Sequence, residues 1–219
     1  MLVTGMDLKV RVLPSGYLQT NAYLITSPRR GEAVLIDAPH FVMDSVEPFL
    51  EEDGCRLVAL LLTHGHYDHI GDAARIRRSG VELYGHRADR ELFENPACML
   101  PYAYPPSIQL EGFDIDHWID EGDRLSLLGL ECEVRHVPGH CPGNVLFYFA
   151  ELEMAFVGDA LFAGSIGRTD LPGGSFQDLE RSIRERIYTL PTATRVLPGH
   201  GPTTLVGDEI ETNPYVAAQ

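Results

Sequence analysis

Three histidines and one aspartate lie within six residues of one segment. His64, His66, Asp68 and His69 directly follow an apolar run from residue 57 to residue 62. A run of that length, with Gly54 before it and polar residues after it, predicts a buried strand. Imidazole and carboxylate groups are ligands that zinc and iron accept. The segment therefore predicts a metal site where a strand leaves its sheet, the place where α/β proteins carry their chemistry.

The spacing of these residues suggests how they could share metal ions. In an extended segment His64 and His66 point to the same side, because side chains alternate with a period of two. One metal could take both, and Asp68 and His69, at the turn into the next helix, could serve a second metal. The alternative is a polar surface loop that merely contains several histidines. We favour the metal site because the same arrangement recurs later in the chain.

Three later segments repeat an apolar strand followed by a ligand-type residue in a glycine-containing turn. They end at His140, Asp159 and His200. If all these strands end at one edge of a sandwich, their ligands converge. The full set of candidate ligands is then His64, His66, Asp68, His69, His140, Asp159 and His200. Five histidines and two carboxylates suit two metals. One residue must bridge the two ions, which a carboxylate can do and a neutral imidazole cannot.

Composition and charge exclude several classes of function. The chain has 219 residues, 44% of them hydrophobic and 22% charged, which is typical of a soluble globular protein. This length fits one domain, which could be built from two similar halves. Its formal net charge of −15 argues against nucleic acid or an anionic membrane surface as a partner. No apolar run approaches the ~20 residues that span a bilayer. The first residues lack the pattern of a signal peptide, so we expect a cytoplasmic protein.

The four cysteines predict neither a zinc knuckle nor a disulfide framework. Cys55, Cys98, Cys132 and Cys141 have no close paired spacing. We expect reduced, buried thiols.

Hydrophobic periodicity predicts alternating strands and helices along most of the chain. The expected strands cover residues 8–13, 18–25, 33–37, 57–62, 81–84, 125–137 (two strands joined at Gly129), 145–149, 154–157 and 195–197. The expected helices cover residues 44–52, 70–79, 88–94 and 176–188, with one further turn possible within 213–219. The pattern is lost between residues 95 and 118. We expect an ordered loop there, and we place it at the border of the substrate site because connections of this length are usually functional.

The ligand-type residues, taken in order, resemble the signature of the metallo-β-lactamase superfamily. The resemblance covers nearly the whole chain and implies an α/β fold, the four-layer αββα sandwich, as a single domain over residues 1–219. It implies one metal on His64, His66 and His140, a second on Asp68, His69 and His200, and a bridging role for Asp159. The metals it implies are two divalent ions, zinc first, with iron or manganese as alternatives.

Two further segments resemble the glyoxalase II-like group of this superfamily. They are Thr20-Asn21-Ala22-Tyr23-Leu24 and the run Gly-Ser-Ile-Gly-Arg-Thr-Asp-Leu-Pro-Gly-Gly over residues 164–174. Enzymes of this group hydrolyse S-2-hydroxyacylglutathione thioesters. The chain ends shortly after His200, so we expect no C-terminal helical domain for glutathione, as in the short bacterial members. The resemblance implies a small-molecule thioester substrate and a substrate contact by Arg168. We separately expect a monomer or small homo-oligomer.

A metal pair suits thioester hydrolysis. It lowers the pKa of a bound water to roughly 7 and polarises the carbonyl group. Asp68 would orient the attacking hydroxide and accept its proton, which makes Asp68 the expected catalytic residue. The two cations would also attract an anionic substrate to a protein that is acidic as a whole.

Several alternatives stay open. Persulfide dioxygenases share this fold and a Gly-Arg-Thr-Asp segment like that at 167–170, and they bind one iron through residues that match His64, His140 and Asp159. The Pro-Gly-Gly at 172–174 favours the hydrolase. A lactonase is a further candidate. A β-lactamase is disfavoured, because the zinc β-lactamases most similar to this arrangement carry cysteine in place of Asp159, and a metal-binding protein without turnover is the non-enzyme alternative.

Some polar residues are expected to be structural. We predict ordinary structural roles for four histidines outside the pattern and a buried position for Cys141. Arg168 and Asp170 could equally form a buried ion pair that holds their loop. The four histidines are His40, His86, His117 and His136.

Overall fold

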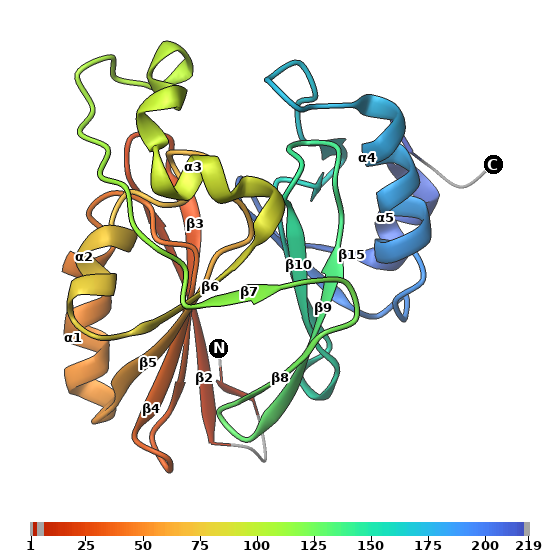
Figure 1. The fold of residues 1–219 in the computed structure, drawn as a ribbon. Helices are drawn as coiled ribbons and strands as arrows, with labels where there is room; N and C mark the ends of the chain where they lie inside the picture. The colour runs from red at the N-terminus through yellow and green to blue at the C-terminus, as the bar shows by residue number, and fades with distance from the viewer. Residues whose placement is uncertain (1, 4–6, 217–219) are drawn as a thin grey trace. The chain divides into compact units, whose positions relative to one another are not determined.

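The computed structural model describes residues 2–3 and 7–216 of the chain (Figure 1). The chain divides into two compact units. Unit 1 comprises Met1–Gly85, Arg90–Trp118 and Leu127–Gly129, and unit 2 comprises His86–Asp89, Ile119–Ser126 and Leu130–Gln219. The single domain over residues 1–219 stays a prediction. Each unit is described by itself below.

Unit 1 is built on a mixed sheet with the strand order β1-β2-β3-β4-β5-β6-β7. The first three pairings are antiparallel, and β4, β5 and β6 are parallel. The strands are β1 (Leu2–Val3), β2 (Leu8–Ser15), β3 (Thr20–Ser27), β4 (Glu32–Ile36), β5 (Arg56–Leu61), β6 (Glu82–His86) and β7 (His117–Ile119). The predicted meander and the predicted buried strand after Gly54 are confirmed.

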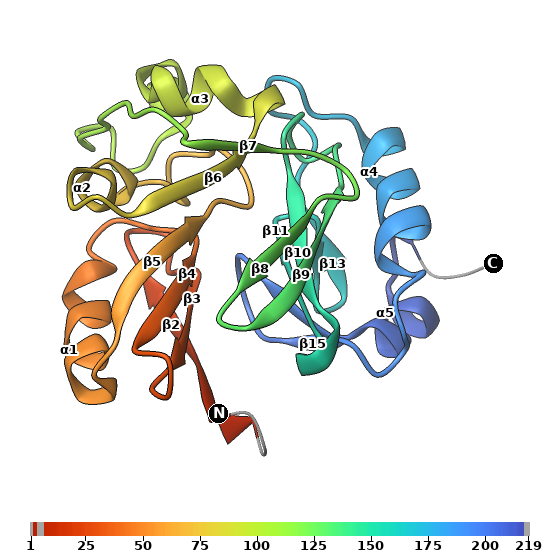
Figure 2. The same cartoon turned by 60° about the horizontal axis from the view of Figure 1, so that its bottom comes forward.

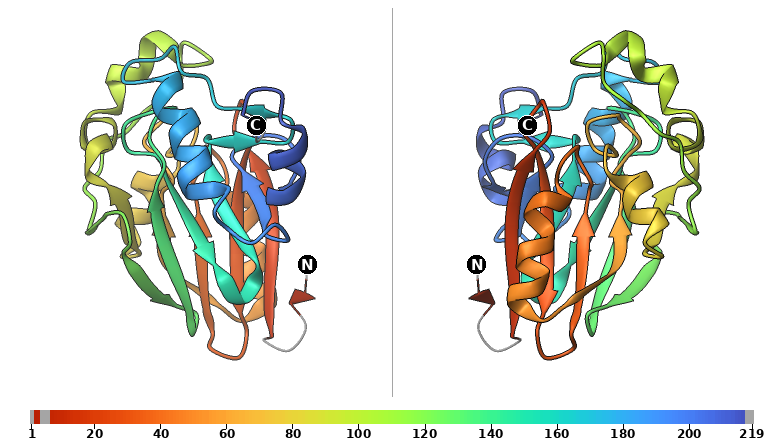
Figure 3. Two further views of the ribbon diagram at one scale, coloured as in Figure 1. Left: turned by 90° about the vertical axis from the view of Figure 1, so that its right-hand side faces the viewer. Right: turned by 90° about the vertical axis from the view of Figure 1, so that its left-hand side faces the viewer.

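Two helices cover one face of the unit 1 sheet. They are α1 (Met43–Asp53) and α2 (Ala73–Arg78), which lie on the same side of the strands in Figures 1 and 2. The helix α1 ends at Gly54, which adopts the left-handed conformation with φ of 62° that favours glycine at a helix C-terminus. Figure 3 shows α1 lying across the strands. The expected helix at 70–79 begins later than predicted, at Ala73.

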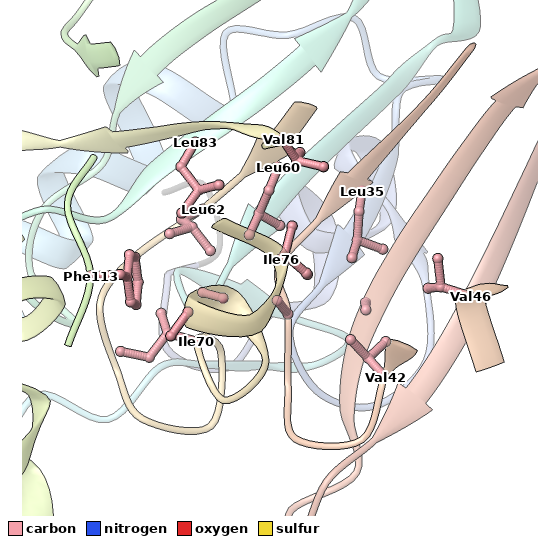
Figure 4. Packing of buried hydrophobic residues seen from close by; sticks show 14 of the residues in the cluster. Leu35, Val42, Val46, Leu60, Leu62, Ile70, Ile76, Val81, Leu83 and Phe113 are labelled. Atoms are coloured by element: carbon pink, nitrogen blue, oxygen red, sulfur yellow. The ribbon is translucent and has the colours of Figure 1, made fainter. Parts of the chain in front are cut away.

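The core of unit 1 lies between this sheet face and the two helices. Leu35 of β4 and Leu60 of β5 lie in one apolar cluster with Val46 of α1 and Ile76 of α2 (Figure 4). Leu61, on the opposite face of β5, is also fully buried. A strand buried on both faces explains the continuous apolar run that precedes the histidines.

Unit 2 contains a six-stranded sheet with the order β15-β14-β11-β10-β9-β8 and a separate two-stranded sheet. The six strands are β8 (Arg124–Leu127), β9 (Leu130–His136), β10 (Val145–Phe149), β11 (Met154–Gly158), β14 (Arg195–Pro198) and β15 (Thr204–Leu205), and the small sheet pairs β12 (Leu161–Phe162) with β13 (Ser165–Ile166). The strand β11 runs parallel to β14 and antiparallel to β10.

Two helices cover one face of the unit 2 sheet. They are α4 (Phe176–Ser182) and α5 (Val206–Thr212), on the same side of the strands in Figures 1 and 2. Leu179 and Val206 pack there with Val157 of the sheet. The predicted helix at 176–188 is present, but its second half, Ile183–Ile187, is a π-helix. The helix α5 was not predicted, and part of the turn of helix expected within 213–219 lies outside the described residues.

The segments that connect the strands contain more helix than expected. A 3₁₀ helix (Arg87–Asp89) and α3 (Arg90–Glu94) occupy the predicted helix at 88–94. The segment 95–118, predicted as a loop, contains a 3₁₀ helix (Pro96–Tyr102) and the start of β7. A further 3₁₀ helix (Ala150–Leu152) joins β10 to β11. In residues 2–3 and 7–216 every helix is too short or too polar to cross a membrane.

Candidate metal centre

Unit 1 brings four of the predicted ligands together immediately after β5. The ring centroids of His64 and His66 lie 4.7 Å apart, and those of His64 and His69 lie 4.1 Å apart. Nε2 of His69 lies 3.6 Å from Oδ2 of Asp68. The three imidazoles are buried. The prediction that His64 and His66 lie side by side is confirmed, although β5 itself ends at Leu61.

One buried carboxylate organises this cluster. Asp37, 2% exposed, directly follows β4 and accepts hydrogen bonds from the backbone N–H and the hydroxyl of Thr63, at 2.8 and 2.7 Å. Its Oδ2 also lies 2.7 Å from Nδ1 of His69. Because an ionised carboxylate only accepts, Nδ1 of His69 carries the proton and Nε2 carries the lone pair. Asp37 thereby fixes the tautomer of His69 that can bind a metal through Nε2.

Thr63 passes the same constraint to His64. The Thr63 hydroxyl donates its proton to Asp37, so its oxygen accepts from Nδ1 of His64, 3.1 Å away. His64 therefore also carries its lone pair on Nε2. The hydrogen bonds that start at Asp37 therefore set two candidate ligands, His64 and His69, in the same tautomer before any metal binds.

Asp68 is held by a residue from the beginning of β3. The hydroxyl of Thr20, which is buried, donates a hydrogen bond of 2.8 Å to Oδ2 of Asp68. This bond holds one oxygen of the carboxylate in place. Thr20 belongs to the Thr-Asn-Ala-Tyr-Leu segment on which the family resemblance partly rests, and its contact with Asp68 gives that segment a physical role.

The segment between α3 and β7 is fastened to the histidine motif through Tyr67. The Tyr67 hydroxyl accepts a hydrogen bond of 3.1 Å from the backbone N–H of Tyr104. Its ring, 5% exposed, packs with Met99 and Ile108 in a small apolar cluster. Burial raises the pKa of the Tyr67 hydroxyl. In the sequence Tyr67 lies between two predicted ligands, His66 and Asp68. Its hydrogen bond and its packing therefore attach this segment to the histidine motif within unit 1.

Unit 2 brings together the other three predicted ligands. Oδ2 of Asp159 lies 3.7 Å from Nε2 of His140 and 3.5 Å from Nε2 of His200. The three residues follow β9, β11 and β14, as the repeated pattern predicts. Asp159 stands within reach of both histidines, an arrangement that suits the bridging role expected of it. The assignment of the seven residues to two metals stays a prediction.

The orientation of His140 comes from the backbone of the Gly-Arg-Thr-Asp segment. Nδ1 of His140 donates a hydrogen bond of 2.8 Å to the carbonyl oxygen of Arg168, which leaves the lone pair on Nε2. Gly167 makes this approach possible. A Cβ at that position would lie 1.8 Å from the carbonyl oxygen of Asp159 and 3.1 Å from Nδ1 of His140. The glycine is therefore required by close packing against two candidate ligands.

The side chain of Arg168 forms an exposed ion pair. Its guanidinium makes two bonds of 2.7 Å to the carboxylate of Asp170, and the side chains are 61% and 69% exposed. The hydrogen bonds from Arg168 lower the pKa of Asp170 to about 2. The expected alternative of a buried ion pair is thus wrong in one respect, since the pair exists but faces solvent.

The four histidines outside the pattern have ordinary hydrogen-bond partners. His40 contacts the Gln109 carbonyl at 3.0 Å, His117 contacts Glu82 at 3.2 Å, and Nε2 of His136 contacts the Pro142 carbonyl at 2.8 Å. Nδ1 of His86 accepts from the Ala88 N–H at 3.2 Å. These contacts satisfy the four imidazoles, and their purely structural roles stay a prediction.

The cysteines are free thiols, but only two of them are buried. Cys132 and Cys141 are inaccessible, Cys55 is half-buried and Cys98 is exposed. The expectation of four buried thiols is therefore wrong for Cys98 and only partly met by Cys55. Burial raises the pKa of the Cys141 thiol well above its ordinary value, so the thiol stays protonated.

The donor chemistry fits divalent transition metals. Three imidazoles have Nδ1 engaged by an acceptor, so each presents Nε2, and both carboxylates lie beside histidines. Histidine and carboxylate sets of this kind accept zinc, iron or manganese. Sequence reasoning proposed the seven candidate ligands but missed Asp37, Thr63 and the Arg168 carbonyl, which orient three of them. One signal was available for Asp37, because it too follows an apolar run, at residues 33–36.

Comparison with known proteins decides the family. The sequence profile of the metallo-beta-lactamase superfamily matches residues 15–200. The chain belongs to this superfamily. Membership gives it the coarse function of a metal-dependent hydrolase.

Three similar proteins illustrate the range of this superfamily. A hydroxyacylglutathione hydrolase, GloC of Haemophilus influenzae, is 35% identical over 213 residues, which are 95% of this chain and 98% of the relative. The crystal structure of BLEG-1, described as a B3 metallo-beta-lactamase, is 34% identical with a TM-score of 0.88, covering 95% of this chain and 99% of that one. The structure of TTHA1623 in a di-iron-bound form is 38% identical with a TM-score of 0.83, covering 94% of this chain and 100% of that one. The predicted metallo-β-lactamase fold class is confirmed.

Proposed function

We propose that the chain is a binuclear metal-dependent hydrolase of a thioester, with an S-2-hydroxyacylglutathione such as S-lactoylglutathione as substrate. The observation that carries the proposal is the set of hydrogen bonds that presents Nε2 of His64, His69 and His140 as metal ligands. The similarity to a hydroxyacylglutathione hydrolase over almost the full length supports the choice of substrate. The products are a hydroxy acid and a thiol.

Each ligand has a proposed place. His64, His66 and His140 would hold one ion, Asp68, His69 and His200 would hold the other, and Asp159 would serve both. When bound, the two cations lower the pKa of a water and polarise the thioester carbonyl. A di-iron-bound relative supports a metal pair, and zinc is our first choice for this chain.

Asp68 is the proposed proton acceptor. The hydrogen bond from Thr20 orients its carboxylate, so that it can direct the attacking water and take its proton. The leaving thiolate needs little general acid, because it is a weaker base than an alkoxide or amine. Asp37 acts through His69 and Thr63 and is a positioning residue.

Arg168 is proposed to contact the anionic part of the substrate. Its guanidinium is exposed, and its ion pair with Asp170 is of the kind that contributes only about 0–1 kcal/mol to stability. Arg168→Ala should raise KM several-fold at unchanged metal content, because the backbone carbonyl that binds His140 is retained. Asp170→Asn is the matched control for the ion pair. An unchanged KM in Arg168→Ala, with a lower melting temperature, would assign Arg168 a structural role.

Four assays on the purified protein separate this function from its rivals. S-lactoylglutathione hydrolysis with kcat/KM above about 10⁴ M⁻¹s⁻¹, in the ordinary enzyme range, would support the proposal. Oxygen consumption with glutathione persulfide and one iron per chain would indicate a persulfide dioxygenase instead. Ring opening of a β-lactam is the third assay, because BLEG-1 is described as a β-lactamase, and lactone hydrolysis is tested beside it. A metal-loaded protein inert in every assay would indicate a binding protein.

We further propose a cytoplasmic protein that acts as a monomer or small homo-oligomer, without nucleic acid or membrane as a partner. The net charge of −15 supports the exclusion of both partners. Sedimentation analysis at micromolar concentration tests the oligomeric state, and larger assemblies would contradict the proposal.

A further inference from the structure

A buried carboxylate in unit 2 contacts the loop that carries His140. Asp89 is 1% exposed and ends the 3₁₀ helix after β6. Its Oδ1 accepts a hydrogen bond of 2.7 Å from the backbone N–H of Gly143. Its Oδ2 lies 3.3 Å from Sγ of Cys141. Because the Cys141 thiol stays protonated, it is the donor in that contact.

The fit between Asp89 and this loop is tight. A Cβ on residue 143 would lie 2.4 Å from Cγ of Asp89 and 2.5 Å from its Oδ1, so only glycine allows the backbone N–H to reach the carboxylate. The two donors stand one and three residues after His140. A single side chain therefore fixes the backbone on the C-terminal side of a predicted metal ligand.

The same loop is also held by other contacts. On its N-terminal side, the Ser182 hydroxyl donates to the Pro138 carbonyl and the Ser175 N–H donates to the Gly139 carbonyl, both at 2.8 Å. His136 holds the Pro142 carbonyl, and its ring stacks on His86 with centroids 4.1 Å apart. These contacts come from hydroxyl, amide and imidazole groups, whereas Asp89 is a buried carboxyl group.

Packing alone does not explain why a carboxyl group, rather than a neutral acceptor, occupies the position of Asp89. Burying a carboxylate is costly unless strong hydrogen bonds compensate, and a neutral acceptor could hold the same two donors. A buried anion near a cation site favours the cation, since the low local dielectric screens it weakly. Hydrogen-bond partners of metal-binding side chains have measurable effects on metal affinity. Asp89 acts one step further out, on the backbone that carries such a side chain.

We propose that Asp89 is a positioning residue that holds the 138–143 loop and thereby increases the affinity of the His140 site for its metal. The inference rests on the proposed function in one respect, which is that His140 binds metal. It extends that function to a residue from a different part of the chain, 54 residues from Gly143.

The test measures zinc affinity by competition with a chromophoric chelator, together with the rise in melting temperature when zinc is added to the apo protein. Asp89→Ala should lower the affinity by about 10–100-fold, the range typical of such supporting residues. Asp89→Asn keeps an acceptor for Gly143 and loses the charge, so it should recover part of the affinity. Both variants should show a smaller zinc-induced rise in melting temperature than the wild type.

Two variants serve as controls. Asp120→Asn removes a negative charge that is 80% exposed from the same part of unit 2, and Cys141→Ser keeps a donor to Asp89. Both should bind zinc as the wild type does. Wild-type affinity in Asp89→Asn and Asp89→Ala, or an equal loss in Asp120→Asn, would overturn the proposal. If Asp89→Ala does not fold, Asp89→Asn decides alone.

The zinc measurement also separates this inference from the proposed activity. If the wild type binds two zinc ions but hydrolyses no thioester, the substrate is wrong and the zinc competition still tests Asp89. If the wild type binds no metal, the proposed function fails and the inference about Asp89 fails with it.

Discussion

The two units supply metal ligands in different ways. Unit 1 provides four candidate ligands from one segment of seven residues, at positions 63–69. Unit 2 provides three, each from a separate loop after β9, β11 and β14. In unit 1 a side chain, Asp37, orients the histidines. In unit 2 a main-chain carbonyl, that of Arg168, orients His140.

This difference has consequences for substitution. A cluster from one segment tolerates small movements of the rest of the unit, because its ligands move together. Ligands on three loops depend on the packing of each loop. We therefore expect unit 2 to be sensitive to changes in backbone packing and unit 1 to changes in the polar residues beneath the cluster.

The largest effect is expected from Gly167→Ala in unit 2. The new methyl group would overlap the Asp159 carbonyl and press on His140, so the loop must move. A displacement of about 1 Å at reacting groups can cost about 100-fold in rate, and we expect kcat/KM to fall by at least that factor. Steady-state kinetics with S-lactoylglutathione and metal analysis on the same sample measure it.

Gly164→Ala is the matched control for this prediction. Gly164 has a positive φ of 68°, but a Cβ added there would meet no atom within 4 Å, so the substitution strains the backbone without a clash. It should lower stability modestly and leave kcat/KM nearly unchanged. Equal losses of activity in the two variants would break the comparison, because backbone packing near the ligands would then not be the cause.

An intermediate effect is expected from Asp37→Asn in unit 1. A carboxylate has two accepting oxygens, but an amide has only one. The amide can therefore not accept from both Thr63 and His69, and the tautomers of His64 and His69 lose their support. We expect zinc affinity to fall by about 10–100-fold. Chelator competition measures the affinity, and nitrogen NMR of the imidazoles reports the tautomers.

Asp53→Asn is the control in the same unit. Asp53 is also buried, and it binds Lys9, Arg11 and Thr26 away from the histidine motif. Its replacement should destabilise the fold while zinc affinity stays at the wild-type value. A comparable loss of zinc affinity in both variants would mean that Asp37 acts only through general stability.

The smallest effect is expected from Tyr67→Phe, which removes one hydrogen bond to the 95–118 segment. The ring and its packing remain, so the loss of stability should be about 1 kcal/mol. If the segment borders the substrate site, KM should rise and proteolysis within 95–118 should become faster. Tyr188→Phe, which loses one bond to the Glu209 carbonyl in unit 2, should change neither.

The sequence predicted the regular parts of the fold well, for identifiable reasons. The strand at residues 145–149 is found with the bounds expected, because it is a continuous apolar run. The helix α5 was missed because Val206–Thr212 includes Gly207 and four polar or charged residues, which obscure the helical periodicity. The π-helix at Ile183–Ile187 has no sequence signal distinct from an α-helix.

The candidate site was predictable to the extent that its residues are local. The histidine spacing and the glycine-containing turns identified all seven candidate ligands. The residues that support them depend on contacts across the fold. Asp37 meets His69 over 32 residues, and Asp89 meets Gly143 over 54. Such pairs are fixed by strand order and packing, which local patterns of sequence do not contain.

The central proposal is that the seven candidate ligands hold one pair of metal ions. It is tested most directly by X-ray absorption spectroscopy on the purified protein with its metal content measured. We predict two metals per chain, histidine and carboxylate ligation, and a metal–metal scattering path of about 3.5–4 Å. One metal per chain without a metal–metal path would contradict the claim and favour the mononuclear iron alternative.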